Sequence, residues 1–326
     1  MKAFVYSEYG APADVMRLAE EPKPTPIDDQ VLVKVHAASV NAADWRMVRA
    51  DPFLVRLFAG LLKPKKFRIL GADIAGKVEA VGGKVTRFKP GDDVFGEVFA
   101  SNFGGFAEYK CAKEDELAPK PANVSFEEAA ATPLAALTAL HGLRDSGRIK
   151  AGDEVLIQGA SGGVGTFCVQ LAKYFGAQVT AVCSGGKMDQ ARRLGADHVI
   201  DYAREDFVRS GKKYDLIAAV NGYRPIMEYR SALKPGGRYA MIGGGSAQLF
   251  EALLLGPLVS LFGGRKMLAV SSTPNLKDLL FLSDLLESGK LKPVIDRRFS
   301  LEEVPAAVEY VEKGHAAGKA VINIAG

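Results

Sequence analysis

A glycine-rich turn between a buried strand and a helix is the segment of this chain best suited to bind an anion. Residues 154–158 are apolar enough for a buried strand, Gly159 to Gly165 supply the turn, and an apolar helical pattern follows. Glycines let an anion approach the backbone, and a helix N-terminus presents amide donors and a partial positive charge. This order predicts a dinucleotide pyrophosphate site, with an ordinary strand–turn–helix connection as the alternative. The expected contacts are Ala160, Ser161, Gly162, Gly163 and Val164.

The residues after the second strand, expected at 178–183, indicate which dinucleotide binds. A site specific for NAD usually carries Asp or Glu about 20 residues after the glycines. Here Ser184 stands 19 positions after Gly165, and Lys187 follows it. Ser184 can donate a hydrogen bond and Lys187 supplies a positive charge, both of which suit a 2′-phosphate. These residues favour NADPH over NADH, with an ordinary solvated loop as the alternative.

Apolar segments alternate with helical patterns through the rest of this region, as is typical of a doubly wound parallel sheet in an α/β protein. Further strands are expected at residues 196–202, 214–222, 235–243 and 266–272. Ligands bind beyond the carboxyl ends of such strands, so Asn221, Ile242 and Gly243 are expected to line the nucleotide crevice. The last segment is expected at the sheet edge, where it would pair across a two-fold axis and make a homodimer.

Composition excludes several function classes. The 326 residues suit two domains, and 48% hydrophobic with 25% charged residues is ordinary for a globular protein. The net charge of +4, from 42 basic and 38 acidic residues, gives no indication of nucleic-acid binding. The longest apolar tract, 249–262, is interrupted and too short to span a bilayer. Three cysteines without disulfide spacing, and an N-terminus that resembles a strand rather than a signal peptide, predict a cytoplasmic protein.

Residues before about 120 have short alternating strands between Gly and Pro turns, which indicates a small β-barrel-like domain. Segments 38–44, 70–76, 88–94 and 132–140, together with the glycine turn, resemble motifs of the medium-chain dehydrogenase/reductase superfamily, specifically its zinc-free, quinone oxidoreductase-like branch. The resemblance covers essentially the whole chain. It implies a GroES-like catalytic and substrate domain at 1–122, completed by 290–326, and an NADP-binding Rossmann domain at 123–289.

The departures from the wider superfamily concern its metal. The zinc alcohol dehydrogenases carry a cysteine at the position of Asn41 and a histidine at the position of Ala72. A catalytic zinc ion needs about three Cys, His or carboxylate ligands, and neither of these two residues is one. The four histidines show no ligand spacing and stand far apart, at positions 36, 141, 198 and 315. We therefore expect no metal.

The chemistry implied by the resemblance is the reduction of a substrate that accepts hydride readily, because no Lewis acid is expected. Hydride transfer from NADPH to a quinone or an α,β-unsaturated carbonyl leaves negative charge on oxygen, which a hydrogen-bond donor or water can satisfy. The expected substrate is a small apolar electrophile. Two alternatives stay open. The chain could be an NADPH-binding sensor or crystallin-like protein with little catalysis, or a zinc-independent alcohol or ketone reductase.

Two residues are candidates for catalysis. Asn41 resembles the family asparagine near the nicotinamide ribose and the substrate, with a turn residue bonded to its own backbone as the alternative. Arg46 could polarise a carbonyl oxygen, or else form a surface ion pair with Asp44. The resemblance also implies contacts with the cofactor for Thr138, Tyr202 and Lys319. Tyr202 could instead be a half-buried aromatic at a strand end.

Segment 51–67 is longer than the matching loop in minimal quinone reductases and is rich in large apolar residues. Such an insertion could wall a pocket for a bulky apolar substrate. The same residues have helical spacing, so a short helix packed on the core is an alternative that does not exclude the first. The spaced residues are Leu54, Leu57, Phe58, Leu61 and Leu62.

Overall fold

The computed structural model describes residues 1–324, which form two compact units. The first unit combines Met1–Leu134 with the chain from Pro274 onward, and the second is Ala135–Thr273. The chain leaves the first unit within helix α5 (Pro133–Leu140) and returns just before α11 (Leu276–Glu287). Helix α11 therefore groups with the first unit, whereas the predicted Rossmann domain extended to residue 289.

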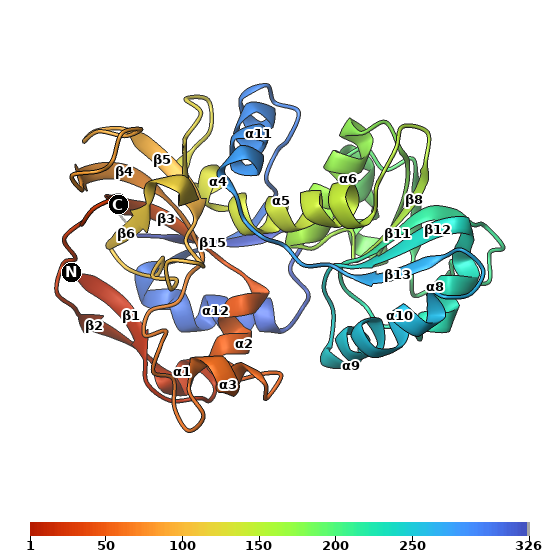
Figure 1. The fold of residues 1–326 in the computed structure, drawn as a ribbon, viewed down its shortest axis with the longest axis horizontal. Coiled ribbons are helices and arrows are strands. Elements are labelled where there is room, and N and C mark those ends of the chain that lie inside the picture. Colours follow the sequence, from red (N-terminus) through yellow and green to blue (C-terminus); the bar gives the residue numbers. More distant parts are fainter. Residues whose placement is uncertain (325–326) are drawn as a thin grey trace. The chain divides into compact units, whose positions relative to one another are not determined.

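The second unit contains a six-stranded sheet in which every neighbouring pair is parallel. Its strand order is β10-β9-β8-β11-β12-β13, so the chain starts in the middle and winds outward in both directions. The predicted doubly wound sheet is confirmed, and β13 lies at its edge (Figure 1). The strands are β8 (Glu154–Gln158), β9 (Gln178–Cys183), β10 (His198–Asp201), β11 (Tyr214–Ala219), β12 (Leu233–Met241) and β13 (Lys266–Ala269).

Helices cover both faces of this sheet. Figure 1 shows α6 on one face and α8 and α10 on the other. Burial of apolar residues from these helices and strands, with the rings of Tyr229 and Tyr239 4.6 Å apart, stabilises the unit. The helical segments are η2 (His141–Ser146), α6 (Gly163–Tyr174), η3 (Gly185–Lys187), α7 (Met188–Arg193), α8 (Ile226–Ala232), α9 (Ser246–Phe250), η4 (Glu251–Leu255) and α10 (Gly256–Val259).

The first unit is built on a mostly antiparallel sheet of short strands, which confirms the predicted β-rich domain. Its order is β14-β15-β3-β4-β5-β7, and β6 also pairs with β3. A separate pair, β1 with β2, lies outside that sheet. The strands are β1 (Lys2–Tyr6), β2 (Met16–Glu20), β3 (Gln30–Val40), β4 (Asp73–Val81), β5 (Asp93–Glu97), β6 (Tyr109–Lys113), β7 (Leu117–Pro119), β14 (Ile295–Ser300) and β15 (Lys319–Asn323).

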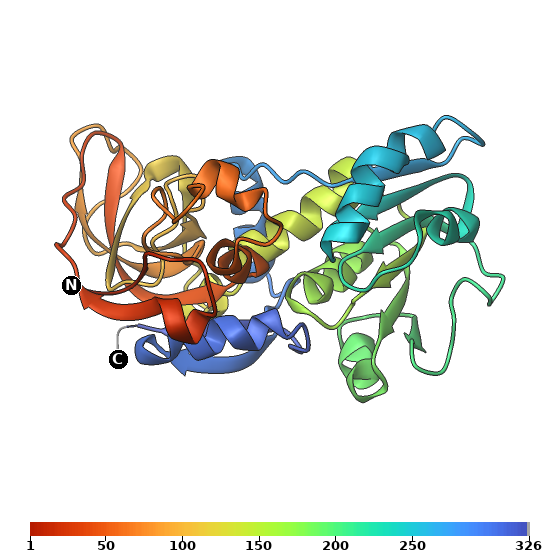
Figure 2. The same cartoon turned by 90° about the horizontal axis from the view of Figure 1, so that it is seen from below.

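The C-terminal part of the chain completes this unit. Strand β15 pairs antiparallel with β3, and α12 packs beside α1 and α2 (Figures 1 and 2). The predicted return of the last strand to the first unit is therefore confirmed. The remaining helical segments are α1 (Pro12–Val15), α2 (Ala42–Arg49), α3 (Val55–Ala59), η1 (Glu114–Glu116), α4 (Phe126–Ala130), η5 (Leu301–Glu303) and α12 (Val304–Glu312).

Segment 51–67 contains a short helix packed on the core, as the second interpretation predicted, but the side chains predicted to be buried are the exposed ones. Only Val55–Ala59 is helical, and the residues of this segment that join the core are Val55, Ala59 and Phe67. The five apolar residues with helical spacing are all at least half exposed. Of the helices in the described part of the chain, none has the length and apolar character needed to cross a bilayer.

Candidate active site

A buried cluster of polar side chains gathers around Asp73 in the first unit. The Asp73 carboxylate accepts hydrogen bonds from Ser39 Oγ at 2.7 Å, from Asn41 Nδ2 at 2.8 Å and from the Leu134 backbone N–H at 2.8 Å. Lys319 Nζ donates to Asn41 Oδ1 at 2.5 Å and lies 3.5 Å from Asp73 Oδ2. Asp73 is fully buried and Lys319 is 3% exposed. The cluster is thus a buried ion pair bridged by an amide.

Three neighbouring strands bring these residues together. Asn41 directly follows β3, Asp73 begins β4 and Lys319 begins β15. Strand β3 pairs antiparallel with both β4 and β15, and the registers place Ser39 opposite Asp73 and Val40 opposite Ala320. The end of β3 therefore meets the starts of both partners. An amide, a carboxylate and an ammonium group come together although 246 residues separate Asp73 from Lys319.

Burial controls the proton affinities of this cluster. It lowers the pKa of Lys319, an effect that the nearby Asp73 carboxylate opposes. It raises the pKa of Asp44 to about 7, against two hydrogen bonds from backbone N–H groups. Burial and the facing Asp73 together raise the pKa of Glu97, which lies opposite Asp73 in the β4–β5 pair, to about 8. Lys319 contacts the Asp73 carboxylate directly, and its charge acts on Asp44 and Glu97 through space.

Asp44 has a structural role that the sequence reading missed. Its carboxylate accepts the Asn41 N–H at 2.7 Å and the Gly71 N–H at 2.9 Å, and so fixes the start of α2. The surface ion pair with Arg46 is therefore wrong, because Asp44 is fully buried. Arg46 instead lies over the Trp45 ring, 4.6 Å from its centroid, and donates to the Asp51 carbonyl. The spacing of Asn41 and Asp44 is typical of a helix-capping pair, and this spacing could have predicted the role of Asp44 from the sequence.

The two positions that the resemblance aligns with zinc ligands, Asn41 and Ala72, hold an amide and a methyl group. Asn41 has both ends of its amide engaged, since Oδ1 accepts from Lys319 while Nδ2 donates to Asp73 and, at 3.4 Å, to the Ser39 carbonyl. Ala72 is a fully buried methyl group. The amide is thus locked in one orientation by a cation and an anion. The sequence reading placed Asn41 and Lys319 in the site but did not anticipate Ser39 or Asp73.

The glycine turn of the second unit has the predicted strand–turn–helix geometry. Gly159 follows β8 with φ of +80°, and Gly162 precedes the first residue of α6. A methyl group on Gly165 would lie 2.0 Å from the Gly159 carbonyl oxygen, so the helix packs on the turn as closely as a glycine allows. In the part of the chain the structure describes, no group accepts the backbone N–H of Gly163, Val164 or Gly165. Three donors at a helix N-terminus fit a pyrophosphate.

The loop expected to hold the 2′-phosphate contains a feature that was not predicted. Ser184 follows β9 and Lys187 ends η3, as the prediction requires. However, Asp201 ends the neighbouring strand β10, and a methyl group on Gly185 would lie 2.7 Å from its carboxylate. The Asp201 carboxylate pairs with Arg204 at 3.7 Å and accepts the Ala203 N–H. The sequence showed no acid after β9, where an NAD site usually has one. The neighbouring strand β10 supplies an acid, Asp201, beside the same loop.

The remaining predicted contacts follow the strands as expected. Tyr202 comes directly after β10 and is 61% exposed, so the alternative of a half-buried aromatic is wrong. Asn221 and Ile242 follow β11 and β12, and their backbone N–H groups donate to the last residues of the neighbouring strands β8 and β11, respectively. A methyl group on Gly243 would lie 2.5 Å from the Val220 carbonyl oxygen. Thr138 lies on α5 and is half-buried.

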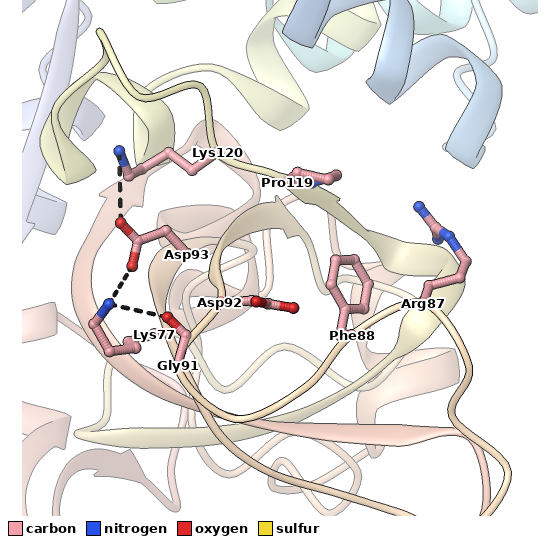
Figure 3. Close-up of a pocket in the computed structure, with 8 residues that line it drawn as sticks. All are labelled: Lys77, Arg87, Phe88, Gly91, Asp92, Asp93, Pro119 and Lys120. Carbon is pink, nitrogen blue, oxygen red and sulfur yellow. Dashed lines mark hydrogen bonds and ion pairs between the residues drawn. The ribbon is translucent and has the colours of Figure 1, made fainter.

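A charged depression of about 480 Å³ lies on the first unit, away from the Asp73 cluster (Figure 3). Lys77 and Asp93 face each other across it at 2.6 Å, one each from β4 and β5. They stand four residues along these strands from Asp73 and Glu97, which is roughly 13 Å. Lys120 approaches the same carboxylate at 3.9 Å. The depression is lined by satisfied ion pairs and holds none of the predicted site residues.

Comparison with known proteins agrees with this architecture. Residues 27–122 match the family described as "Alcohol dehydrogenase GroES-like domain", and residues 194–322 match "Zinc-binding dehydrogenase". A 2-methylene-furan-3-one reductase of Solanum lycopersicum is 36% identical over 99% of this chain and 79% of its own. A chloroplastic NADPH-dependent alkenal/one oxidoreductase of Arabidopsis thaliana is 34% identical over the same shares. The solved quinone oxidoreductase from Coxiella burnetii matches with a TM-score of 0.87 and 31% identity, covering 100% of this chain and 99% of its own.

A β-rich GroES-like unit joined to a parallel sheet with a dinucleotide turn defines a nicotinamide-dependent oxidoreductase. The chain belongs to the medium-chain dehydrogenase/reductase superfamily, in its quinone oxidoreductase branch. The predicted family, fold class and enzyme class are confirmed. The segment matching "Zinc-binding dehydrogenase" does not include Asn41 or Ala72, so that match does not bear on the metal positions.

Proposed function

We propose that this protein is a zinc-independent, NADPH-dependent reductase of quinones or α,β-unsaturated carbonyl compounds. The observation that carries the proposal is the Asn41–Asp73–Lys319 cluster, in which an ammonium group binds the amide that the resemblance aligns with a zinc ligand of the alcohol dehydrogenases. An ammonium group supplies positive charge but no coordination position for an alkoxide. The reaction that remains accessible is hydride addition to a substrate that is already electron-poor. The names of the tomato and Arabidopsis relatives describe reductases of this kind.

The chain's own residues then hold the reactants and stabilise charge. The bound coenzyme supplies the hydride. The three N–H donors that begin α6 would hold its pyrophosphate. Lys319 would supply a fixed positive field, partly offset by Asp73, for the negative charge that develops on the substrate oxygen, with Asn41 held in position beside it. Arg46 is the proposed hydrogen-bond donor to that oxygen. Because Lys319 is bonded to the Asn41 amide, Lys319 would act on the substrate without touching it, by positioning Asn41 and by its electric field.

The preference for NADPH rests on the loop after β9. Ser184 and Lys187 would contact the 2′-phosphate as donor and cation. The Asp201 carboxylate beside this loop opposes a phosphate, and we propose that Arg204, which pairs with it, offsets that charge. Tyr202, exposed next to Asp201, would contact the adenosine end.

The primary test is NADPH oxidation against a panel of quinones, 2-alkenals and simple ketones, with a chelator present and with NADH as the comparison. Turnover of quinones or alkenals with NADPH, unchanged by the chelator, is the expected result. Loss of turnover in the chelator would refute the metal-free mechanism. Ketone turnover alone would instead indicate a carbonyl reductase, and tight NADPH binding with no turnover would indicate a sensor.

Ser184→Asp combined with Lys187→Ala tests the coenzyme assignment separately. Each removed contact is a charge-assisted or donor interaction, so the ratio of kcat/KM for NADPH to that for NADH should fall about 30-fold or more. The kcat with saturating coenzyme should change little, because neither residue lies in the Asp73 cluster. An unchanged ratio would show that the 2′-phosphate is bound elsewhere.

We also propose that the protein is a cytoplasmic homodimer. Strand β13 is the edge of the parallel sheet, and its free side offers backbone N–H and C=O groups to a second copy. The Val270 N–H donates to Met241 of β12, so by alternation the Ala269 N–H faces the free side; Ala269→Pro would remove that donor and should yield a monomer by light scattering. A monomeric mass of the unmodified protein at all concentrations would refute the dimer.

The proposed cytoplasmic location rests on the cysteines. The three cysteines of the protein are all unpaired in the described chain, as a reducing compartment favours.

A further inference from the structure

A patch of large apolar side chains on the first unit lies beside a run of cations, and none of its residues belongs to the proposed catalytic machinery described above. We call the exposed side chains of residues 53–68 the α3 patch. Figure 1 shows α3 and its flanking loops, in orange, at the lower edge of the first unit. The apolar members are Phe53, Leu54, Leu57, Phe58, Leu61 and Leu62. Leu57 is 69% exposed and Leu62 is 88% exposed.

The exposure of these side chains is built into the local structure. Val55 and Ala59 turn inward from α3, so the positions between them must face outward. Tyr9 Oη donates to the Gly60 carbonyl at 2.7 Å, and the Lys65 N–H donates to the Ala59 carbonyl at 2.9 Å. These bonds pin the loop after α3 to the unit. The fixed backbone therefore keeps these apolar side chains exposed to water. Such a cluster is unusual on a monomeric protein in bulk solvent and indicates an interaction surface.

The charge beside the patch is of one sign. Lys63, Lys65 and Lys66 are exposed, and no carboxylate lies within 4.0 Å of any of them in the described residues. Arg68 pairs with Glu21, and no acidic residue occurs from position 52 to 68. An apolar surface bordered by unneutralised lysines complements a surface that is apolar below and anionic above. A bilayer with anionic headgroups has that order.

We propose that the α3 patch docks the protein on anionic membranes, with the leucines and phenylalanines entering the interface and the three lysines contacting the headgroups. The protein would lie on the membrane surface, since the described helices do not span a bilayer. Docking of this kind is a property separate from turnover, and it does not depend on the proposed function. It would give the protein access to apolar molecules that partition into lipid.

A second exposed apolar surface, on η4, α10 and the loop after α10, serves as the comparison. Leu254 is 67% exposed and Leu261 is 73% exposed, which matches Leu57 and Leu62 in residue type and approximately in exposure. This surface contains Glu251 and lacks a run of lysines such as 63–66. Apolar character is thus similar in the two surfaces, while only the α3 patch has the cations. Substitutions on both surfaces separate specific docking from general adhesion.

The test is co-sedimentation of the full chain with vesicles of phosphatidylcholine alone and of phosphatidylcholine mixed with phosphatidylserine. We expect binding to the mixed vesicles that weakens as salt rises. Lys63→Gln with Lys65→Gln and Lys66→Gln should weaken it roughly 100-fold, since each lysine near an anionic surface contributes severalfold. Leu57→Ser with Leu62→Ser should weaken it about tenfold or more. Leu254→Ser with Leu261→Ser should leave it unchanged.

Three outcomes would overturn the proposal. Equal binding to both kinds of vesicle would show that charge has no part in docking. An equal loss in the Leu254/Leu261 variant would show that exposed leucines adhere without a specific site. No vesicle binding, together with a smaller mass of the Leu57/Leu62 variant by light scattering, would identify the patch as a contact between copies of the chain. Circular dichroism of each variant checks that it is folded, and the lysine variant changes only exposed side chains.

Discussion

The buried pair of Lys319 and Asp73 gives the most direct test of the view that an ammonium group organises this site. The perturbation is a double-mutant cycle with Lys319→Met, Asp73→Asn and the two combined. Methionine keeps most of the lysine's volume and asparagine keeps the carboxylate's shape, so each change mainly removes a charge. If the ammonium neutralises Asp73, each single variant leaves the other charge unpaired in the interior. The double variant removes both charges of the pair.

The geometry sets the size of the effect. Lys319 Nζ lies 3.5 Å from Asp73 Oδ2. Coulomb's law with an effective dielectric constant of about 20 gives a gross attraction of about 5 kcal/mol at that distance. Desolvation of both groups offsets part of it, and Asp73 keeps three other donors when the lysine is removed. We expect each single variant to lose about 3 kcal/mol of the free energy of unfolding. The loss in the double variant should be smaller than the sum of the two single losses, by a coupling energy of about 2 kcal/mol or more.

Urea unfolding of all four proteins, followed by circular dichroism, measures the coupling. The matched control is the Lys77–Asp93 pair, which joins the same two residue types at 2.6 Å, with side chains 48% and 36% exposed. Lys77→Met, Asp93→Asn and their double variant should couple by less than about 1 kcal/mol. Coupling at Lys319 and Asp73 no larger than in this exposed pair would refute the role assigned to the ammonium group.

Two further predictions concern packing and protonation. Gly165→Ala should destabilise the protein by about 3 kcal/mol or more and weaken NADPH binding, because its methyl group would lie 2.0 Å from the Gly159 carbonyl oxygen. The control is Gly186→Ala, whose methyl group would have nothing within 4 Å and should have neither effect. Thermal melts measure the stability and coenzyme titrations measure the binding. Glu97, with a pKa raised from 4.5 to about 8, binds a proton in the folded protein that the unfolded chain releases. The free energy of unfolding should therefore fall as pH rises from about 4.5 to about 8, on the order of 5 kcal/mol. Glu97→Gln should flatten that decline in urea titrations at several pH values, and a decline of the same size in the variant would assign it to other groups.

The parts of the fold that sequence could predict depend on short-range signals. The strand, turn and helix around Gly165 are contiguous, and each has its own pattern of apolar residues and glycines. The parallel sheet followed from the alternation of such patterns, and the edge position of β13 followed from its being the last strand. Strand ends were less accurate. The strand expected at 196–202 spans only His198–Asp201, although the backbone N–H groups of Asp197 and Tyr202 on either side still donate to β9.

The contents of the candidate site could not be predicted in the same way, because they depend on long-range pairing. Asp73 and Lys319 meet only because β15 and β4 both pair with β3. Asp201 reaches the loop after β9 from the neighbouring strand, so its distance from the glycines along the chain gave no indication. The helical spacing in segment 51–67 predicted a buried face, and burial went instead to the smaller Val55 and Ala59.

The proposed metal-free mechanism, with a buried lysine in the site, also predicts a limit on what the enzyme can reduce. A metal ion can bind the substrate oxygen directly, whereas the Lys319 ammonium is committed to Asn41 and Asp73 and is almost inaccessible to solvent. Its contribution to charge that develops on a substrate is therefore a field, which weakens with distance. Substrates whose own conjugation spreads the negative charge need less of that field than simple ketones do. Turnover should therefore decrease from quinones to enones to saturated ketones, and Lys319→Met should reduce it most for the ketones; equal losses for all three classes would show that Lys319 acts on stability alone.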